Sequence, residues 1–310
     1  MVLRERYGRR MVSRAHSNVV TIAFGSLAVG LLVLALKSFA AYATGSIALY
    51  SDALESVVNV VTAIVALVAI RFAARPADAN LQYGYYKAEY FSAVIIGAFI
   101  AVAAILILQK AWAGFSNPVP FDADPIGLAV SVVATLVNLG WAQFIIRAGK
   151  REKSLSLVAD GQHLMTDVLS TAAVLAGVFL TVVTGYVPLD SIMAAFVAVT
   201  ILWSGWQLVR QSVIGLMDVS VEAPVLARIK DIISANAEGA IEAHDIRTRQ
   251  AGKMVFIDFH LVVPGAMSVE AAHAICDGIE AKLREAVEGA QVTIHVEPEE
   301  KAKHTGIVVV

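Results

Sequence analysis

Apolar residues dominate the first two thirds of the chain, in runs that are long enough to cross a lipid bilayer. A membrane-spanning helix needs about 20 mostly apolar residues. Six stretches meet this requirement, at residues 18–41, 47–72, 88–113, 125–147, 156–183 and 189–213. The pattern therefore predicts an all-α membrane domain built from six transmembrane helices.

After residue 215 the pattern changes to that of a small water-soluble domain. The alternation of apolar and polar residues in MVFIDFHLVV is typical of a strand with one buried face. Helices are predicted at 222–237 and 268–287, and strands at 241–250, 253–263 and 291–297. This α-β-β-α-β order predicts a C-terminal α+β domain of ferredoxin-like type, with its helices on one face of the sheet. The expected domains are a membrane domain at 1–215, a soluble domain at 216–298 and a polar tail at 299–310.

Basic residues are concentrated in alternate connections between the predicted spans. The N-terminal segment, residues 71–87, residues 147–153 and the end of the sixth span carry Lys or Arg. The connections at 42–46, 114–124 and 184–188 carry none. By the positive-inside rule, both termini and the soluble domain are expected on the cytoplasmic side.

Composition narrows the class of protein further. Hydrophobic residues make up 58% of the 310 residues and charged residues 16%, as in membrane proteins. Up to residue 215 there are 15 Lys and Arg against 11 Asp and Glu, and after it 9 against 15. The overall charge of −2 gives no electrostatic footprint for nucleic acid. The single cysteine, Cys276, excludes an internal disulfide and a multi-thiolate metal site within one chain.

Two of the apolar runs contain a similar group of polar residues at spacing i, i+3, i+7, which places each group on one helical face. The groups are Asp52, Glu55 and Asn59 in the second span, and Asp160, His163 and Asp167 in the fifth. A charged side chain at membrane depth costs roughly 2.5–3.5 kcal/mol, so such residues usually serve an ion or proton pathway. Turned toward each other, the two faces would offer carboxylate, amide and imidazole ligands to a divalent cation.

Spacing selects the ligands within these groups. Glu55 and Asn59 are four residues apart, as are His163 and Asp167, and two ligands on one helix reach a single ion at this spacing. The plainer alternative is that these residues join helices through hydrogen bonds. Asp52 and Asp160 lie one turn earlier, where outer-shell or proton-transfer roles suit them. The chain lacks an H-E-x-x-H motif, so an intramembrane metalloenzyme is not predicted.

The lysines of the membrane domain have a simpler expectation. Lys37 and Lys110 lie toward the ends of apolar runs, where long side chains extend to the membrane interface. Lys87 and Asp218 are placed at the same interface, and sequence separation alone does not support an ion pair between them.

Histidines gather in the soluble domain, which holds five of the seven. His260 and His295 lie in predicted strands, and Glu297 follows His295 by two residues and shares its face. Imidazole with carboxylate suits zinc, iron and related cations. We therefore expect a second metal site here, to which His304 in the tail does not belong.

Several motifs resemble one known family over almost the whole chain. They are GSIALYSDALES, RPADANLQYGYYKAE, H-x-x-x-D in the fifth span, AHDIRTRQAG, FIDFHL and IHVEP. On these the chain resembles the cation diffusion facilitator family, near the branch of bacterial zinc and ferrous-iron efflux transporters.

The resemblance implies a homodimer in the bacterial inner membrane that exports Zn²⁺, Fe²⁺ or Mn²⁺ in exchange for protons. It implies a transport site made by Glu55, Asn59, His163 and Asp167. It also implies a cytoplasmic metal site made by His244, His260, His273, His295 and Glu297, and an interdomain ion pair between Lys87 and Asp218.

Two departures from the family pattern matter. Asn59 stands where the family usually has Asp, which leaves two carboxylates in the transport site and shifts preference from zinc toward iron or manganese. Leu81 and Tyr85 replace ligands of a loop site found in related transporters, so that site is expected to be absent, with only Asp78 retained. The runner-up function is a metal-binding regulatory membrane protein that no longer transports.

Overall fold

The protein divides into two compact units. The computed structural model describes residues 2–44, 47–116, 125–185, 188–304 and 307–308. The first unit is Met1–Val213 and the second is Ile214–Val310.

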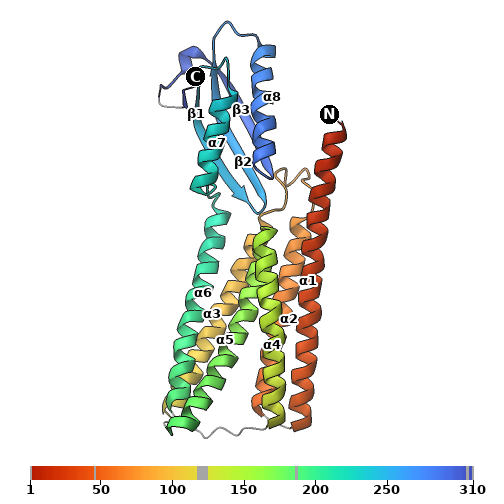
Figure 1. Ribbon diagram of the computed structural model, residues 1–310, viewed down its shortest axis with the longest axis vertical. Helices are drawn as coiled ribbons and strands as arrows, with labels where there is room; N and C mark the ends of the chain where they lie inside the picture. The colour runs from red at the N-terminus through yellow and green to blue at the C-terminus, as the bar shows by residue number, and fades with distance from the viewer. Residues whose placement is uncertain (1, 45–46, 117–124, 186–187, 305–306, 309–310) are drawn as a thin grey trace. The chain divides into compact units, whose positions relative to one another are not determined.

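The first unit is a bundle of long helices (Figure 1). These are α1 Val2–Thr44, α2 Ile47–Ala73, α3 Ala88–Ser116, α4 Pro125–Arg151, α5 Leu155–Thr184 and α6 Pro188–Leu216. They confirm the predicted helical membrane domain. Within the described part of the chain, segments of α1, α2, α3, α4 and α6 are long and apolar enough to cross a membrane. The remaining helix, α5, carries the polar group Asp160, His163 and Asp167.

Helix α5 contributes residues to three apolar clusters of this unit and packs most closely against α4, α3 and α2. Ala159 belongs to a cluster with residues of α2, α3 and α6. Leu157 packs with α1 and α2, and Leu164 with α4. A Cβ on Gly161 would lie 2.5 Å from Cγ1 of Ile146 on α4, so the two helices approach closely at this glycine. The packing therefore holds the polar face of α5 among its neighbours.

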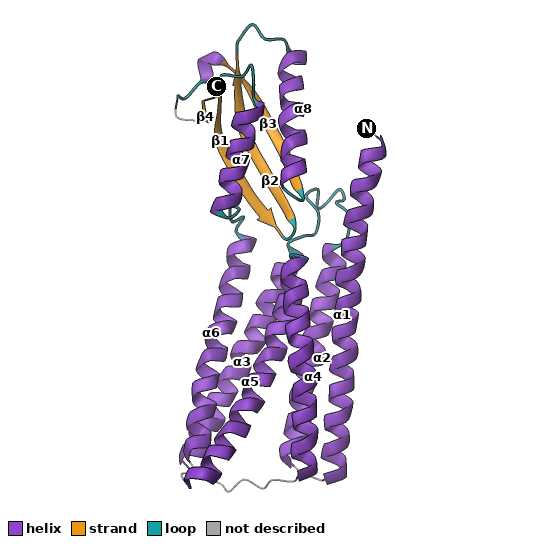
Figure 2. Ribbon diagram, in the orientation of Figure 1, coloured by secondary structure: helices purple, strands orange, loops and turns teal. Residues whose placement is uncertain are grey.

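The second unit is an α+β domain, drawn with orange strands and purple helices in Figure 2. Its elements are α7 Ala223–Asn236, β1 Glu242–Ala251, β2 Met254–Val263, α8 Val269–Ala286, β3 Ala290–Pro298, a 3₁₀ turn η1 Glu299–Lys301, and β4 Ile307–Val308. The sheet order is β3-β2-β1-β4. Strand β2 is antiparallel to β1 and parallel to β3. The predicted α-β-β-α-β order is confirmed.

Both helices of the second unit cover the same face of the sheet. Ile229 of α7 and Ile279 of α8 are fully buried in one apolar cluster with Ile257, Phe259 and Leu261 of β2. Because side chains alternate along a strand, the residues between these positions on β2 point to the other face. That other face carries the histidines described below.

Local signals set the ends of these elements. Pro224 stands in the first turn of α7, where its missing N–H is not needed. The hydroxyl of Ser268 accepts a hydrogen bond from the N–H of Ala271 and caps α8. Gly252 joins β1 to β2 with a φ of +57°, in the left-handed region that glycine adopts without strain.

Part of the C-terminal tail is folded onto the sheet. Residues 307–308 form β4, which pairs antiparallel with β1 so that Ile307 lies opposite Ala243. Ile and Val suit a pleated, half-buried position. A strand of two residues is too short to show the alternation of apolar and polar positions, so it could not be recognised from the sequence.

Candidate functional site

Asp167 joins α5 to α2 and α4 inside the first unit. The Nδ2 group of Asn59 on α2 donates to its Oδ2 at 3.3 Å, and Nδ2 of Asn138 on α4 donates to the same oxygen at 2.8 Å. Asp167 and Asn59 are 4% and 3% exposed. The structure thus brings together Asn59 and Asp167, two residues predicted for the transport site.

Several buried polar atoms in this region have no hydrogen-bond partner among the described residues. They are Oδ1 of Asn59, Oδ1 of Asp167 and both ring nitrogens of His163. His163 is 4% exposed and lies one turn before Asp167 on the same helix. Buried polar groups are nearly always hydrogen-bonded, because an unmade bond costs about 1–3 kcal/mol. The two oxygens and the unprotonated ring nitrogen of His163 are acceptors without donors, which is what a bound cation requires.

The remaining predicted residues of this region differ in how they are placed. Glu55 and Asp52 lie on α2, outside the residues whose side chains the structure describes. Asp160 is 1% exposed and accepts hydrogen bonds from Ser26 on α1 and, at 3.5 Å, from Thr62 on α2. These donors are distinct from the donors to Asp167, so Asp160 belongs to a neighbouring polar contact.

Two residues that contact Asp167 were not predicted for this site. Lys37 of α1 was expected to extend to the membrane interface, and this expectation was wrong: it is 2% exposed and its Nζ lies 3.8 Å from Oδ2 of Asp167. The carboxylate of Asp167 compensates the charge of the ammonium group, as water would do at the membrane interface. Lys110 is exposed, as expected. Asn138 was overlooked although its place inside an apolar run was a usable signal. Asn59, Asp167, His163, Asn138 and Lys37 are called the intramembrane site below.

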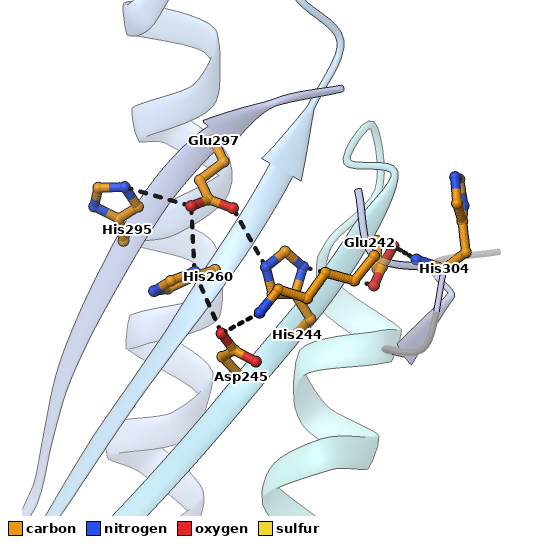
Figure 3. A network of polar contacts seen from close by, with 8 residues as sticks. Glu242, His244, Asp245, His260, His295, Glu297 and His304 are labelled. Atoms are coloured by element: carbon orange, nitrogen blue, oxygen red, sulfur yellow. Dashed lines mark hydrogen bonds and ion pairs between the residues drawn. The ribbon is translucent and has the colours of Figure 1, made fainter. Parts of the chain in front are cut away.

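Three histidines form a row across the sheet of the second unit, on the face opposite α7 and α8 (Figure 3). His244 on β1 pairs in register with His260 on β2, which pairs in register with His295 on β3. The ring centroids are 5.3 Å apart for His244 and His260, and 5.0 Å apart for His260 and His295. Strand pairing therefore gathers residues that are far apart along the chain.

Glu297 connects the three rings. Its Oε2 lies 3.3 Å from Nε2 of His244, and its Oε1 lies 3.3 Å from Nδ1 of His260 and 3.7 Å from Nε2 of His295. Both ring nitrogens of His244 are buried without a hydrogen-bond partner in the described part of the protein. Four of the five residues predicted for the cytoplasmic site thus lie together.

Asp245 was not predicted, and the backbone explains its presence. The register of the β1–β2 pairing shifts between His244 and Arg247, which marks a β-bulge, and Asp245 has a φ of +52°. Such a bulge redirects side chains that would otherwise alternate. Ligand atoms of His244, Asp245 and His260 consequently lie within 4.8 Å of one another, a separation that one metal ion could bridge. With Glu242, His295 and Glu297 they are called the histidine cluster below.

The C-terminal tail contacts this cluster. Nζ of Lys303 donates to Oδ2 of Asp245 at 2.6 Å, and this hydrogen bond keeps the pKa of Asp245 below its usual range. The backbone N–H of His304 donates to Oε2 of Glu242 at 2.9 Å. Oε1 of the buried Glu242 lies 3.6 Å from Nδ1 of His244. Glu242 could have been found from the sequence, since it precedes His244 by two residues and shares its face.

Two other predicted features lie elsewhere. His273 is on α8, which covers the opposite face of the sheet, and its Nε2 lies 3.7 Å from Oδ1 of Asp277. The Lys87–Asp218 pair would join the two units and stays a prediction. Within the second unit, Asp218 lies 3.4 Å from Nη1 of Arg249.

Asp78, in the connection after α2, serves a local turn. Its carboxylate accepts hydrogen bonds from the hydroxyl of Tyr85 and from the N–H groups of Asn80 and Leu81. Together these donors, Tyr85 foremost, lower the pKa of Asp78. Its carboxylate is therefore already used by the loop itself.

Two family profiles cover most of the chain. Residues 23–217 match the profile described as the cation efflux transmembrane domain. Residues 221–299 match the cytoplasmic domain of cation efflux proteins.

Individual proteins resemble the chain over nearly its full length. It is 42% identical over 278 residues to the "Uncharacterized transporter sll1263" of Synechocystis sp., with 90% of each chain covered. It is 33% identical over 273 residues to the cation-efflux pump FieF of Shewanella oneidensis, covering 88% of this chain and 92% of the pump. The metal-bound C-terminal domain of the CzcD transporter from Thermotoga maritima is 28% identical, covers 27% of this chain and all of that chain (100%), and has a TM-score of 0.24.

A helical membrane domain with buried polar side chains, followed by an α+β domain of the cation efflux type, defines the class of cation-transporting membrane proteins. The chain belongs to the cation diffusion facilitator family and is a cation efflux transporter. The family resemblance noted from the sequence motifs is thereby confirmed.

Proposed function

We propose that this transporter exports a divalent transition metal in exchange for protons, through a transport site formed by Glu55, Asn59, His163 and Asp167. The observation that carries the proposal is the set of buried acceptor atoms without donors on Asn59, His163 and Asp167. These residues come from two helices, and the hydrogen bond between Asn59 and Asp167 holds the helices together at the site. Glu55, one turn before Asn59, completes the set.

The donor set suits a transition metal of intermediate softness. One imidazole nitrogen, two carboxylates and an amide oxygen are ligands that Zn²⁺, Fe²⁺ and Mn²⁺ all accept. An amide oxygen carries no charge, so the site holds the ion less tightly than one with a third carboxylate. This favours Fe²⁺ or Mn²⁺ relative to Zn²⁺.

Proton exchange follows from the ligands. A metal binds deprotonated imidazole and carboxylate, and its binding therefore releases protons. Protons on the far side of the membrane therefore compete with the metal for His163 and the carboxylates, and favour release of the metal. Asp160 lies one helical turn before His163 and accepts hydrogen bonds from Ser26 and Thr62. We place this second buried carboxylate on the same proton route.

The histidine cluster has a regulatory role in this proposal. We place the second unit and both chain termini on the cytoplasmic side of the membrane. Metal bound by the histidine cluster would link two protomers there. His273 lies across the sheet from the cluster of its own chain, so its place in the predicted ligand set requires a second copy of the protein. We accordingly propose a homodimer in a bacterial inner membrane, with Lys87 and Asp218 paired between the two units.

The test is metal flux in proteoliposomes under an imposed pH gradient, with Zn²⁺, Fe²⁺ and Mn²⁺ assayed in parallel. Wild type should transport one of these ions, and Asp167→Asn should reduce the flux by about tenfold or more because a charged ligand is lost at nearly unchanged volume. Asn59→Asp should shift preference toward Zn²⁺.

Two controls make the result decisive. Collapsing the pH gradient should stop net transport in wild type if protons are the counter-ion. Asp231→Asn, an exposed substitution on α7, should leave the flux unchanged. Absence of flux for all three ions in wild type, with metal still bound by the histidine cluster, would instead favour a non-transporting regulatory protein.

A further inference from the structure

Lys37 is a buried cation in the middle of the proposed transport machinery. It is 2% exposed and its side chain is among the largest that are fully buried. Lysine is almost never fully buried unless it is paired, because removing an ammonium group from water costs several kcal/mol. Its Nζ lies 3.8 Å from Oδ2 of Asp167, whose side chain is 5% exposed. The two charges therefore neutralise each other in a place that water does not reach.

The two oxygens of Asp167 have different surroundings. Oδ2 receives three groups, namely Nδ2 of Asn138 at 2.8 Å, Nδ2 of Asn59 at 3.3 Å and the ammonium group of Lys37 at 3.8 Å. Oδ1 has no hydrogen-bond partner among the described residues. One oxygen is thus held by the protein, and the other is left for a further cation.

Asn138 already fixes the carboxylate, so Lys37 is not needed to orient it. The hydrogen bond from Asn138 is shorter than the ion-pair distance to Lys37 and approaches the same oxygen from a different helix. What Lys37 adds is a positive charge. The other buried residues of α1 are small and uncharged, so Lys37 is the one charged side chain on the described buried face of this helix.

We propose that Lys37 is a tethered counter-cation that sets the metal affinity of the transport site. The inference rests on the proposed function of that site. Without metal, the ammonium group neutralises the charge of Asp167 and stabilises the empty site inside the membrane. With metal bound to Oδ1, ammonium and metal share one carboxylate and repel each other, which weakens binding and speeds release. Lys37 therefore lowers the affinity of the transport site for the metal and raises the rate of the transport cycle.

The test is Zn²⁺ flux at fixed pH in proteoliposomes containing the full-length protein, with KM and maximal rate measured separately. Lys37→Met removes the charge and keeps the length of the side chain. We expect its KM to fall by about tenfold or more, since repulsion at such short range is large even when screened, and its maximal rate to fall because release slows. Lys37→Arg keeps the charge and should restore KM toward the wild-type value.

Controls separate charge from packing. Lys110→Met makes the same substitution at an exposed position on α3 and should change neither parameter. A merely structural role for Lys37 would raise KM in Lys37→Met, which is the opposite sign. If Lys37→Met does not fold, Lys37→Gln tests the same loss of charge with a polar group that still donates to Asp167.

The outcomes distinguish this inference from the function on which it rests. Zn²⁺ flux in wild type together with an unchanged or raised KM in folded Lys37→Met or Lys37→Gln overturns the inference alone. A lowered KM and lowered maximal rate, restored by Lys37→Arg, supports it. No flux of Zn²⁺ or of the other two ions in wild type overturns the proposed function and the inference together.

Discussion

In a regular strand, His244 and Asp245 would point to opposite faces of the sheet, because successive side chains alternate. The bulge after His244, with a φ of +52° at Asp245, interrupts this alternation for one step. Asp and Asn tolerate left-handed backbone better than most other residues with a Cβ. One residue thus supplies both the backbone conformation and a carboxylate for the histidine cluster.

This arrangement gives a prediction at the scale of a single residue. Asp245→Asn keeps a side chain that tolerates the left-handed backbone but removes the negative charge. We expect the Zn²⁺ affinity of the histidine cluster to fall by about tenfold while the thermal stability stays near that of wild type. Calorimetric titration of the full-length protein carrying Asp167→Ala isolates this cluster, and Asp231→Asn is the matched control. An unchanged affinity would exclude Asp245 as a ligand.

At the scale of elements, the close approach of α5 to α4 depends on a glycine. Gly161 lies directly between Asp160 and Gln162, and a Cβ there would lie 2.5 Å from Cγ1 of Ile146 and 2.9 Å from Cγ1 of Ile145. These contacts are with α4, which also contributes Asn138 to the intramembrane site. The distance between the two helices therefore determines whether Asn138 reaches Asp167.

Replacing Gly161 should disturb both packing and site. Gly161→Ala is expected to destabilise the protein by about 1–3 kcal/mol through overpacking, and to lower metal flux as α4 is pushed away. Thermal unfolding in detergent measures the first effect. Gly140→Ala on α4 is the control, because its Cβ would meet nothing within 4 Å and alanine favours helix. Equal stability of the two variants would show that this contact does not limit helix spacing.

At the scale of the whole molecule, helix period and strand alternation predict much of what the structure shows. The spacing of Asn59, His163 and Asp167 placed them on two polar helix faces, because the period of a helix is a local property. The partnership of Lys37 with Asp167 depends on which helix packs beside α5, and no local pattern carries that information. Asp245 escaped prediction for a related reason, since a bulge reverses the alternation from which strand faces are inferred.

The histidine cluster also yields a prediction for the stability of the protein. A ligand that binds only the folded state stabilises it by about 2.7 kcal/mol at a hundredfold excess over Kd. Zn²⁺ should therefore raise the unfolding temperature of the second unit, and a chelator should reverse the change. His260→Ala should abolish the shift, whereas His304→Ala should not, because its contact with Glu242 is made by the backbone. A shift that persists in His260→Ala would place the bound metal elsewhere.

The row of His244, His260 and His295 has a consequence for how the second unit is made. Each histidine comes from a different strand, and the parallel pairing of β2 with β3 joins two strands that α8 separates along the chain. A slip of one residue in either pairing would turn a histidine to the opposite face. An ion that needs all three rings would therefore discriminate the correctly assembled sheet from its misaligned alternatives. Metal supply and the yield of properly paired domains would then rise and fall together.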